Sequence, residues 1–189
     1  GGSRVVKRGT TAKTWTKLAG AATRVAVLDT QAWVVTSDGS IFAQAGAKWQ
    51  RVQGPVAQDI GASAKGVWII DVNGRIHQRV GNGWKNVPGT AQRIDIDQDG
   101  RPWVVDKKGV TWVHDHNQKW PKLPGAAVDV AADIPGMARI VGKDGKTYVF
   151  NGTKRNWDAI SQDADSQAIG AGGGQVWRLT KQTAIYRLQ

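Results

Sequence analysis

Tryptophan recurs through this 189-residue chain at a nearly constant interval, and each copy opens the same short pattern. Successive members of this first series are separated by 34, 35, 36 and 37 residues. Each is followed three residues later by an aliphatic side chain, as in Trp49 with Val52 and Trp84 with Val87. A fixed period of roughly 20–50 residues is typical of repeat architectures. The first series consists of Trp15, Trp49, Trp84, Trp120 and Trp157.

Two further aromatic series keep nearly the same period, so the repeat extends through the whole unit. Turn dipeptides such as Asp38-Gly39 and Asn73-Gly74 precede the third series in register. Asp-Gly and Asn-Gly supply the positive φ values that a tight hairpin needs. The second series contains Trp33, Trp68, Trp103 and Trp177, with one place skipped near Ala138 and Arg139, and the third contains Phe42, His77, Trp112, Tyr148 and Tyr186.

Each unit predicts four short strands. In the first unit these are an aliphatic strand near 24–27, a tryptophan-bearing strand near 32–35, an aromatic strand near 40–43, and the strand that Trp49 opens. β-Branched and aromatic runs with turns every ~8–12 residues are typical of an all-β fold. The chain has no Glu, one Met and 24 Gly, a composition that argues against helices.

The repeat predicts how these sheets pack. A single four-stranded sheet cannot bury both of its faces, whereas sheets stacked radially cover one another. We therefore predict a β-propeller of about five four-stranded blades, a single domain over residues 15–189 with repeats that start near 15, 49, 84, 120 and 157. The last unit supplies only three strands, and Trp15–Leu18 is a fourth-type strand without partners. The ring is therefore expected to close by pairing N- and C-terminal strands.

Residues 1–14 fall outside this scheme. Arg4-Val5-Val6-Lys7-Arg8 has the pattern of another third strand, which makes one strand surplus. Either it packs outside the ring, or the chain is cut from a six-bladed parent. Gly1-Gly2-Ser3 resembles a cloning remnant and carries no targeting information.

The segment from Trp84 to Trp112 reads WKNVPGTAQRIDIDQDGRPWVVDKKGVTW, and this pattern resembles the tectonin repeat. The resemblance extends from about Trp15 to Leu188. It implies a β-propeller, usually of six blades, of a kind often found as lectins of innate defence or cell-surface recognition. Members bind glycans, including lipopolysaccharide, and others dock proteins or lipids. The fourth unit departs from the pattern, because Met137-Ala138-Arg139-Ile140 lacks the second-series tryptophan.

No catalytic site is expected. All 15 acidic residues are Asp, and several lie in or beside the repeated turns, where turn chemistry explains them. The sequence has no G-x-S-x-G elbow, phosphate-binding loop or HExxH motif. His114-Asp115-His116 could direct two imidazoles to one side of a strand, but nothing specifies a further ligand. We therefore expect no enzyme, no metal site and no cofactor.

The chain has no Cys, which excludes disulfides and thiolate metal sites. No apolar run approaches the ~20 residues of a membrane span, so no transmembrane segment is expected. The formal net charge of +11 is the clearer functional signal, because cations attract anionic ligands.

Two sets of side chains are candidate ligand-binding residues. The second-series tryptophans could stack on a sugar ring, although packing between blades explains them as well. The turn between the second and third strands of a unit repeatedly carries a cation, and propellers often bind ligands at this rim. Solvated surface charge is the alternative explanation of those cations. The candidates are Trp33, Trp68, Trp103 and Trp177 with Arg75, Lys107, Lys108, Lys143, Lys146 and Lys181.

These features predict a multivalent, lectin-like carbohydrate-binding propeller. Its expected partners are surface glycans or an anionic glycolipid surface such as lipopolysaccharide, for which a secreted or cell-surface location is favoured. Repeated weak sites gain avidity on a surface that presents many copies of the ligand. A non-catalytic protein-docking scaffold is the alternative. Nucleic acid is an unlikely partner, because the basic residues are scattered among the units rather than laid along one groove.

Overall fold

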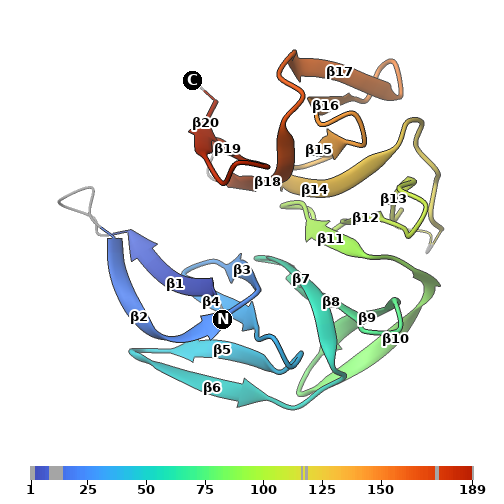
Figure 1. The fold of residues 1–189 in the computed structure, drawn as a ribbon. Helices are drawn as coiled ribbons and strands as arrows, with labels where there is room; N and C mark the ends of the chain where they lie inside the picture. Colours follow the sequence, from blue (N-terminus) through green and yellow to red (C-terminus); the bar gives the residue numbers. More distant parts are fainter. Residues whose placement is uncertain (1–2, 9–14, 116, 118, 173–174, 189) are drawn as a thin grey trace.

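The protein is an all-β propeller with no helix in the part of the chain that the structure describes. That structure, a computed structural model, describes residues 3–8, 15–115, 117, 119–172 and 175–188. Its sheets follow one another around a central axis and form an arc, with β1 and β2 on one side of the opening and β18–β20 on the other (Figure 1). The expected family architecture of repeated antiparallel sheets is confirmed.

Five sheets of three or four strands form the blades, each in sequence order from the inside outward. Blade 1 contains β3 (Arg24–Leu28), β4 (Gln31–Val35), β5 (Ile41–Ala45) and β6 (Lys48–Val52), and blade 2 contains β7 (Ala57–Ser63), β8 (Gly66–Asp71), β9 (Arg75–Val80) and β10 (Gly83–Thr90). Blade 3 contains β11 (Arg93–Ile96), β12 (Pro102–Val105) and β13 (Thr111–Val113), and blade 4 contains β14 (Ala127–Ile134), β15 (Met137–Gly142), β16 (Thr147–Asn151) and β17 (Asn156–Ser161). Blade 5 contains β18 (Ser166–Gly172), β19 (Gln175–Thr180) and β20 (Ile185–Arg187).

Blade 3 keeps only part of its expected fourth strand. A single bridge joins Trp112 to Lys122, and the Leu123 amide donates to the Thr111 carbonyl at 2.9 Å. Pro121 has no N–H to donate, which interrupts a continuous ladder at this edge. The segment still lies where a fourth strand would lie.

The expected closure of the ring is wrong. The strand that begins at Trp15 does not pair with β18–β20 among the described residues. Instead β2 (Trp15–Ala22) pairs with β1 (Ser3–Arg8), the strand that the repeat left surplus. The two form a separate two-stranded sheet beside blade 1, and no hydrogen-bonded ladder joins the two ends of the described chain. Local pairing along one hairpin costs less chain entropy than pairing between the two ends of the chain.

Adjacent blades are joined by a backbone hydrogen bond at one rim. The carbonyl of the glycine in each second-to-third-strand turn accepts from an amide at the start of the next blade. The glycine φ is positive, which L side chains rarely adopt, so the Asp-Gly and Asn-Gly signal has a direct structural cause. These bonds join Ala57 to Gly39, Ala91 to Gly74, Ala127 to Gly109 and Ser166 to Gly145, at 2.9, 2.9, 2.7 and 3.0 Å.

The first-series tryptophans make a second type of hydrogen bond between adjacent sheets. The indole Nε1 atoms of the last four members of the series each donate to a backbone carbonyl of the preceding sheet. The acceptor lies four residues after the first-series tryptophan of that preceding sheet. The indole of Trp84 lies over Gly54, one residue beyond its acceptor Gln53. The donor–acceptor pairs are Trp49 with Ala19, Trp84 with Gln53, Trp120 with Pro88 and Trp157 with Pro124, at 2.7, 2.9, 2.8 and 2.9 Å.

The hydrophobic core lies between blades rather than within one sheet. Trp33, Val35 and Ile41 of blade 1 pack with Ile60 and Ile69 of blade 2 in one buried cluster. Comparable clusters join blade 2 to blade 3 and blade 3 to blade 4. Water is thus excluded from the face of a sheet only because the neighbouring blade covers it.

The close approach of Trp84 to Gly54 predicts a specific sensitivity to side-chain volume. A Cβ at residue 54 would lie 2.3 Å from the Trp84 Nε1 atom. Gly54→Ala should therefore lower the free energy of unfolding by about 1–3 kcal/mol in urea denaturation. Gly170→Ala is the matched control, because a Cβ there meets nothing within 4 Å and should change stability by less than about 0.5 kcal/mol. Equal effects of the two substitutions would contradict the packing role of the indole.

Candidate functional site

The turns between second and third strands form one rim of the propeller, which we call the hairpin rim. Two of its turns are closed by an Asp at the end of the second strand. The Asp71 Oδ1 atom accepts from the amides of Asn73 and Arg75, and the Asp106 Oδ1 atom accepts from those of Lys108 and Val110. These hydrogen bonds help hold the pKa of both carboxyls below its ordinary value, although partial burial opposes them. The hairpin-rim carboxylates are thus structural.

The hairpin rim carries the six cationic residues that the sequence analysis proposed as ligand-binding candidates. Their side chains are exposed, except that of Lys146, which is half-buried. No salt bridge involves any of them within the described ranges. Lys143 Nζ donates to the Lys108 carbonyl at 2.6 Å, which brings the turns of blades 3 and 4 together. The set consists of Arg75, Lys107, Lys108, Lys143, Lys146 and Lys181.

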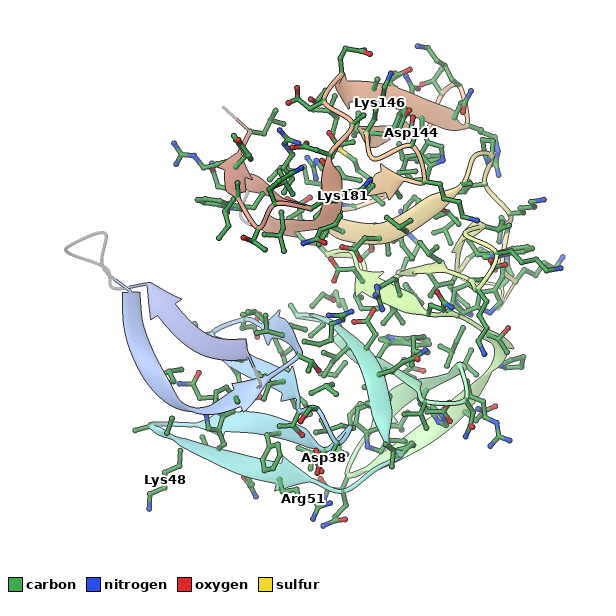
Figure 2. All side chains as sticks on the ribbon, viewed as in Figure 1. Asp38, Lys48, Arg51, Asp144, Lys146 and Lys181 are labelled. Carbon is green, nitrogen blue, oxygen red and sulfur yellow. The ribbon has the colours of Figure 1, made fainter. Side chains whose placement is uncertain are left out.

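This charge is concentrated on blades 3 to 5. Lys146 and Lys181 lie in the turns of the two adjacent blades 4 and 5, whereas the corresponding turn of blade 1 presents Asp38 (Figure 2). Hydrogen bonds from Thr36 and Ser40 lower the pKa of Asp38 to about 2, so this carboxylate is ionised at neutral pH. Most of the hairpin-rim cations therefore lie on one side of the arc, where the Asp144 carboxylate lies among them, whereas the blade 1 turn presents Asp38 with Arg51 nearby (Figure 2).

Second-series tryptophans are mostly core residues. Trp33, Trp68 and Trp103 are 7%, 4% and 1% exposed. A sugar ring cannot reach their faces in this structure, because neighbouring blades cover them. Trp177 alone is open, at 39% exposure, and the Arg187 guanidinium lies 5.8 Å from its ring centroid. The structure therefore corrects the expectation that the three buried indoles stack on a ligand, and it leaves Trp177 accessible.

Arg139 replaces the missing tryptophan of blade 4 in a related arrangement. Trp103 Nε1 donates to Asp97, six residues earlier, and Arg139 Nη1 donates to Asp133, also six residues earlier. Both Asp residues are buried. A guanidinium paired with a buried carboxylate thus substitutes for an indole hydrogen bond, which explains how the fourth repeat tolerates the departure.

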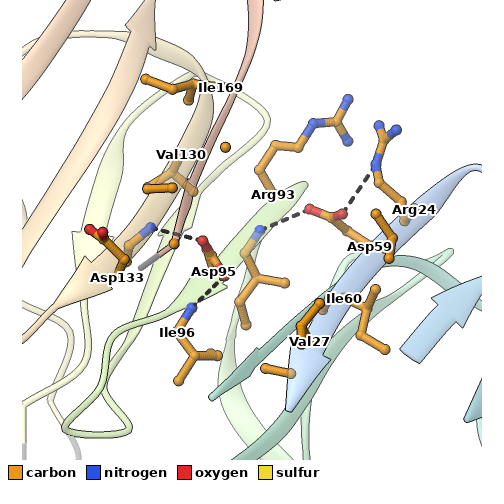
Figure 3. Close-up of a pocket in the computed structure, with 18 of the residues that line it drawn as sticks. Arg24, Val27, Asp59, Ile60, Arg93, Asp95, Ile96, Val130, Asp133 and Ile169 are labelled. Carbon is orange, nitrogen blue, oxygen red and sulfur yellow. Dashed lines mark hydrogen bonds and ion pairs between the residues drawn. The ribbon is translucent and has the colours of Figure 1, made fainter. Parts of the chain in front are cut away.

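The central channel holds a second group of charged side chains. The first strands of the blades line a cavity of about 1090 Å³ (Figure 3). In blades 1 to 4 the residue before the central aliphatic of the first strand alternates in charge, in the order Arg24, Asp59, Arg93 and Asp129. Blade 5 has the uncharged Ala168 at this position. The Arg24 Nε and Asp59 Oδ1 atoms are 3.1 Å apart, and the corresponding Arg93–Asp129 distance is 3.7 Å. Sequence analysis missed this alternation, although aligning the first strands would have revealed it.

Channel carboxylates also bind the next blade. The second oxygen of Asp59 accepts from the Ile94 amide, that of Asp95 from the Ala132 amide, and that of Asp129 from the Ile169 amide, at 2.8–2.9 Å. Burial raises the pKa of Asp59 to about 7 and that of Asp95 to about 8, and it also raises the pKa of Asp129. These carboxyls join neighbouring blades, and repulsion from Asp129 adds to the rise in the pKa of Asp59 and of Asp95.

The His114-Asp115-His116 cluster is the candidate metal site that the sequence offers. No group of three or more potential side-chain ligands gathers in the described part of the chain. His116 of the His114-Asp115-His116 cluster lies outside the described residues. His114 itself packs edge-on against the Trp120 ring, with centroids 4.8 Å apart. No helix within the described ranges is long and apolar enough to span a membrane.

Comparison with known proteins identifies a family and a fold. The model of the Tectonin domain matches residues 21–133. No curated protein is significantly similar to the chain. Among solved structures, the chain superposes on one of a nidogen/laminin complex with a TM-score of 0.76 and 10% identity, covering 100% of this chain and 86% of that one.

Two further solved structures are similar. One is YCF48 bound to a D1 peptide, with a TM-score of 0.62, 15% identity and 90% of this chain covered. Another is yeast RCC1 (Prp20) with bound Kap60, with a TM-score of 0.67, 10% identity and 95% covered. This chain spans 66% and 62% of those two chains. At such identities the likeness concerns the fold alone.

The raised pKa values of the channel carboxyls predict a pH-dependent stability. Asp95 titrates near 3.8 in the unfolded chain and near 8 in the folded one. Its contribution to stability is complete below about pH 4 and is lost as the pH rises to about 8, because the unfolded chain releases its proton first. We expect the urea midpoint to fall between about pH 5 and about pH 8, and Asp95→Asn to flatten that fall. Asp99→Asn, an exposed control, should keep the wild-type slope; an unchanged slope in Asp95→Asn would contradict the assignment.

Proposed function

This chain belongs to the tectonin-domain family, whose model matches residues 21–133, and on that premise we propose that it is a non-catalytic, lectin-like module that binds acidic glycans at the hairpin rim. One observation carries the proposal: the hairpin-rim cations of blades 2 to 5 are accessible and form no salt bridge among the described residues. Such cations are available to phosphate, carboxylate or sulfate groups without first breaking an internal ion pair.

The geometry favours a multivalent ligand. Neighbouring turns carry Lys107 and Lys108 on blade 3, Lys143 and Lys146 on blade 4, and Lys181 on blade 5. Each cation in water contributes little by itself, because exposed ion pairs are screened by solvent and salt. A phosphorylated glycolipid surface such as lipopolysaccharide presents many anions at once, and simultaneous contacts multiply the weak individual affinities.

In this proposal the affinity for the glycan comes mainly from charge and less from aromatic stacking. Trp33, Trp68 and Trp103 are buried, so Trp177 is the one second-series indole open to a sugar face. Binding should therefore weaken steeply as the salt concentration rises and should depend more on the anionic groups of the glycan than on the identity of its neutral sugars.

A second candidate is a protein-docking scaffold. It is favoured by the packed blade interfaces, in which the second-series indoles of blades 1 to 3 have no open face. Two similar structures were solved with a bound partner, a D1 peptide on YCF48 and Kap60 on yeast RCC1. A saturable protein complex that is insensitive to added acidic glycan would favour this candidate over the lectin.

Removing hairpin-rim charge tests the leading proposal. Lys107→Ala/Lys108→Ala should weaken binding to lipopolysaccharide roughly three- to tenfold at about 50 mM salt, measured by titration calorimetry. Raising the salt to about 0.5 M should weaken wild-type binding strongly and reduce the difference between the two proteins.

The matched control removes the same charge from the opposite rim. Lys48 and Lys119 are exposed and precede the fourth-strand tryptophans Trp49 and Trp120. Lys48→Ala/Lys119→Ala should retain near wild-type affinity. If both double variants lose the same affinity, only net charge matters and the hairpin rim is not a site; if wild type binds no acidic glycan at millimolar concentration, the lectin proposal fails.

A further inference from the structure

Two arginine side chains at one end of the central channel are arranged alike. Arg24 is the first residue of β3, and Arg93 is the first residue of β11, two blades further along the arc. Each pairs with the last residue of the second strand in its blade, Val35 or Val105, which leads into the hairpin-rim turn. Both arginines line the cavity of about 1090 Å³. They therefore lie where the channel opens on the hairpin rim.

Each guanidinium is held by the protein and still has donors to spare. Nη1 of Arg24 donates to the Thr23 carbonyl at 2.9 Å, and Nη1 of Arg93 donates to the Gln92 carbonyl at 3.1 Å. The Nε atom of each faces the carboxylate of the following blade. A guanidinium carries more N–H donors than these contacts use. Nη2 of neither arginine donates to a protein group among the described residues, so these donors are available to a ligand.

The two guanidinium groups face the same part of the channel. Figure 3 shows both directed to one side of Asp59. Attraction from Arg24 and from Arg93 opposes the rise in the pKa of both Asp59 and Asp129, so the four groups lie within electrostatic reach of one another. The side chains of Arg24 and Arg93 are 37% and 32% exposed, whereas that of Asp59 is 6% exposed. A molecule that enters the channel therefore meets the guanidinium groups before the Asp59 carboxyl.

The channel carboxyls compensate this positive charge only in part. The Arg93 Nε and Asp129 Oδ1 atoms are 3.7 Å apart, which is longer than a hydrogen bond. Asp59 and Asp129 each turn their second oxygen to a backbone amide of the next blade. Burial raises the pKa of Asp59 to about 7, so this carboxyl is partly neutral at neutral pH. The two arginines thus keep positive charge that an anion can neutralise.

We propose that Arg24 and Arg93 form a binding site for a tetrahedral oxyanion, a phosphate or sulfate group, at the hairpin-rim end of the channel. We call it the channel site. Phosphate and sulfate present several oxygens that can accept from the two guanidinium groups at once. Their negative charge also relieves the repulsion between the two arginines. The hairpin-rim cations take no part, so the channel site stands or fails separately from the glycan proposal.

Asp59 couples the channel site to pH. The charged groups that face its carboxyl come from three strands: Arg24 of β3, Arg93 and Asp95 of β11, and Asp129 of β14. An oxyanion beside Arg24 repels the ionised form of Asp59, so binding of the oxyanion favours uptake of a proton. Affinity should therefore rise as the pH falls from about 8 to about 6, through the pKa of Asp59. Arg and Lys keep their charge in this range, so surface cations alone would give no such dependence.

Inorganic sulfate is the first probe, because its own charge does not change over this pH range. At constant ionic strength it should bind the wild-type protein saturably at millimolar concentration and shift the Nε–Hε signals of Arg24 and Arg93 in ¹⁵N NMR spectra. The affinity should increase roughly threefold or more between about pH 8 and about pH 6. In Asp59→Asn, whose side chain cannot ionise, this increase should disappear. A pH-independent affinity of the wild type would contradict the coupling to Asp59.

Variants of the arginines locate the sulfate. Arg24→Gln and Arg93→Gln should each weaken binding at least about tenfold, because each removes charge-assisted hydrogen bonds. Arg93→Lys keeps the charge but loses the planar fork, and it should also bind more weakly than wild type. Arg51→Gln removes the same charge from an exposed position on β6, and as the matched control it should keep affinity within about twofold. Unfolding midpoints verify that the variants fold.

Two phosphate compounds identify the source of the oxyanion. Inorganic phosphate and glucose 6-phosphate are titrated in the same way, and tighter binding of the sugar phosphate supports the end group of a larger ligand, whereas tighter binding of inorganic phosphate supports the free ion. The proposal is overturned if sulfate does not bind saturably at millimolar concentration, if Arg24→Gln and Arg51→Gln weaken binding alike, or if the guanidinium signals of Arg24 and Arg93 do not shift.

Discussion

Each blade of this propeller excludes water from its face only where the neighbouring blade packs against it. Hydrogen bonds as well as apolar packing make the contact between two blades. At the hairpin rim a turn-glycine carbonyl accepts from the next blade. Near the outer strands an indole donates to the preceding sheet. In the channel a carboxylate accepts from the next first strand. Each of these hydrogen bonds pairs a polar group that would otherwise be buried without a partner. The interfaces are therefore specific as well as hydrophobic.

These interfaces decide which residues remain for binding. Trp33, Trp68 and Trp103 are buried between blades and cannot contact a ligand. Asp71 and Asp106 accept hydrogen bonds from the backbone of their own turns. The lysines of these turns are exposed or half-buried and form no salt bridge among the described residues. The hairpin rim therefore combines a hydrogen-bonded backbone with accessible cations. Such an arrangement suits repeated anionic groups on a surface better than a single enclosed sugar.

The two ends of the arc differ in the contacts that the described strands make. Blade 1 is covered by the β1–β2 sheet, and Trp49 makes the usual indole bond to it. Blade 5 has three strands among the described residues, and its buried contact with blade 4 contains Val141 and Ile169 but no aromatic ring.

The sequence by itself determined the all-β class, the repeat boundaries and the positions of the turns, because Trp, Asp-Gly and Asn-Gly act through local geometry and a fixed period. It also placed the cations on one rim, since strand order fixes which turns share an end. It could not show that Trp177 is open while Trp103 is buried, because exposure depends on whether a following blade covers the ring. Only the tertiary structure decided that β2 pairs with β1 and that alternating Arg and Asp residues meet in the channel. Those features depend on contacts between distant segments, which a local pattern does not encode.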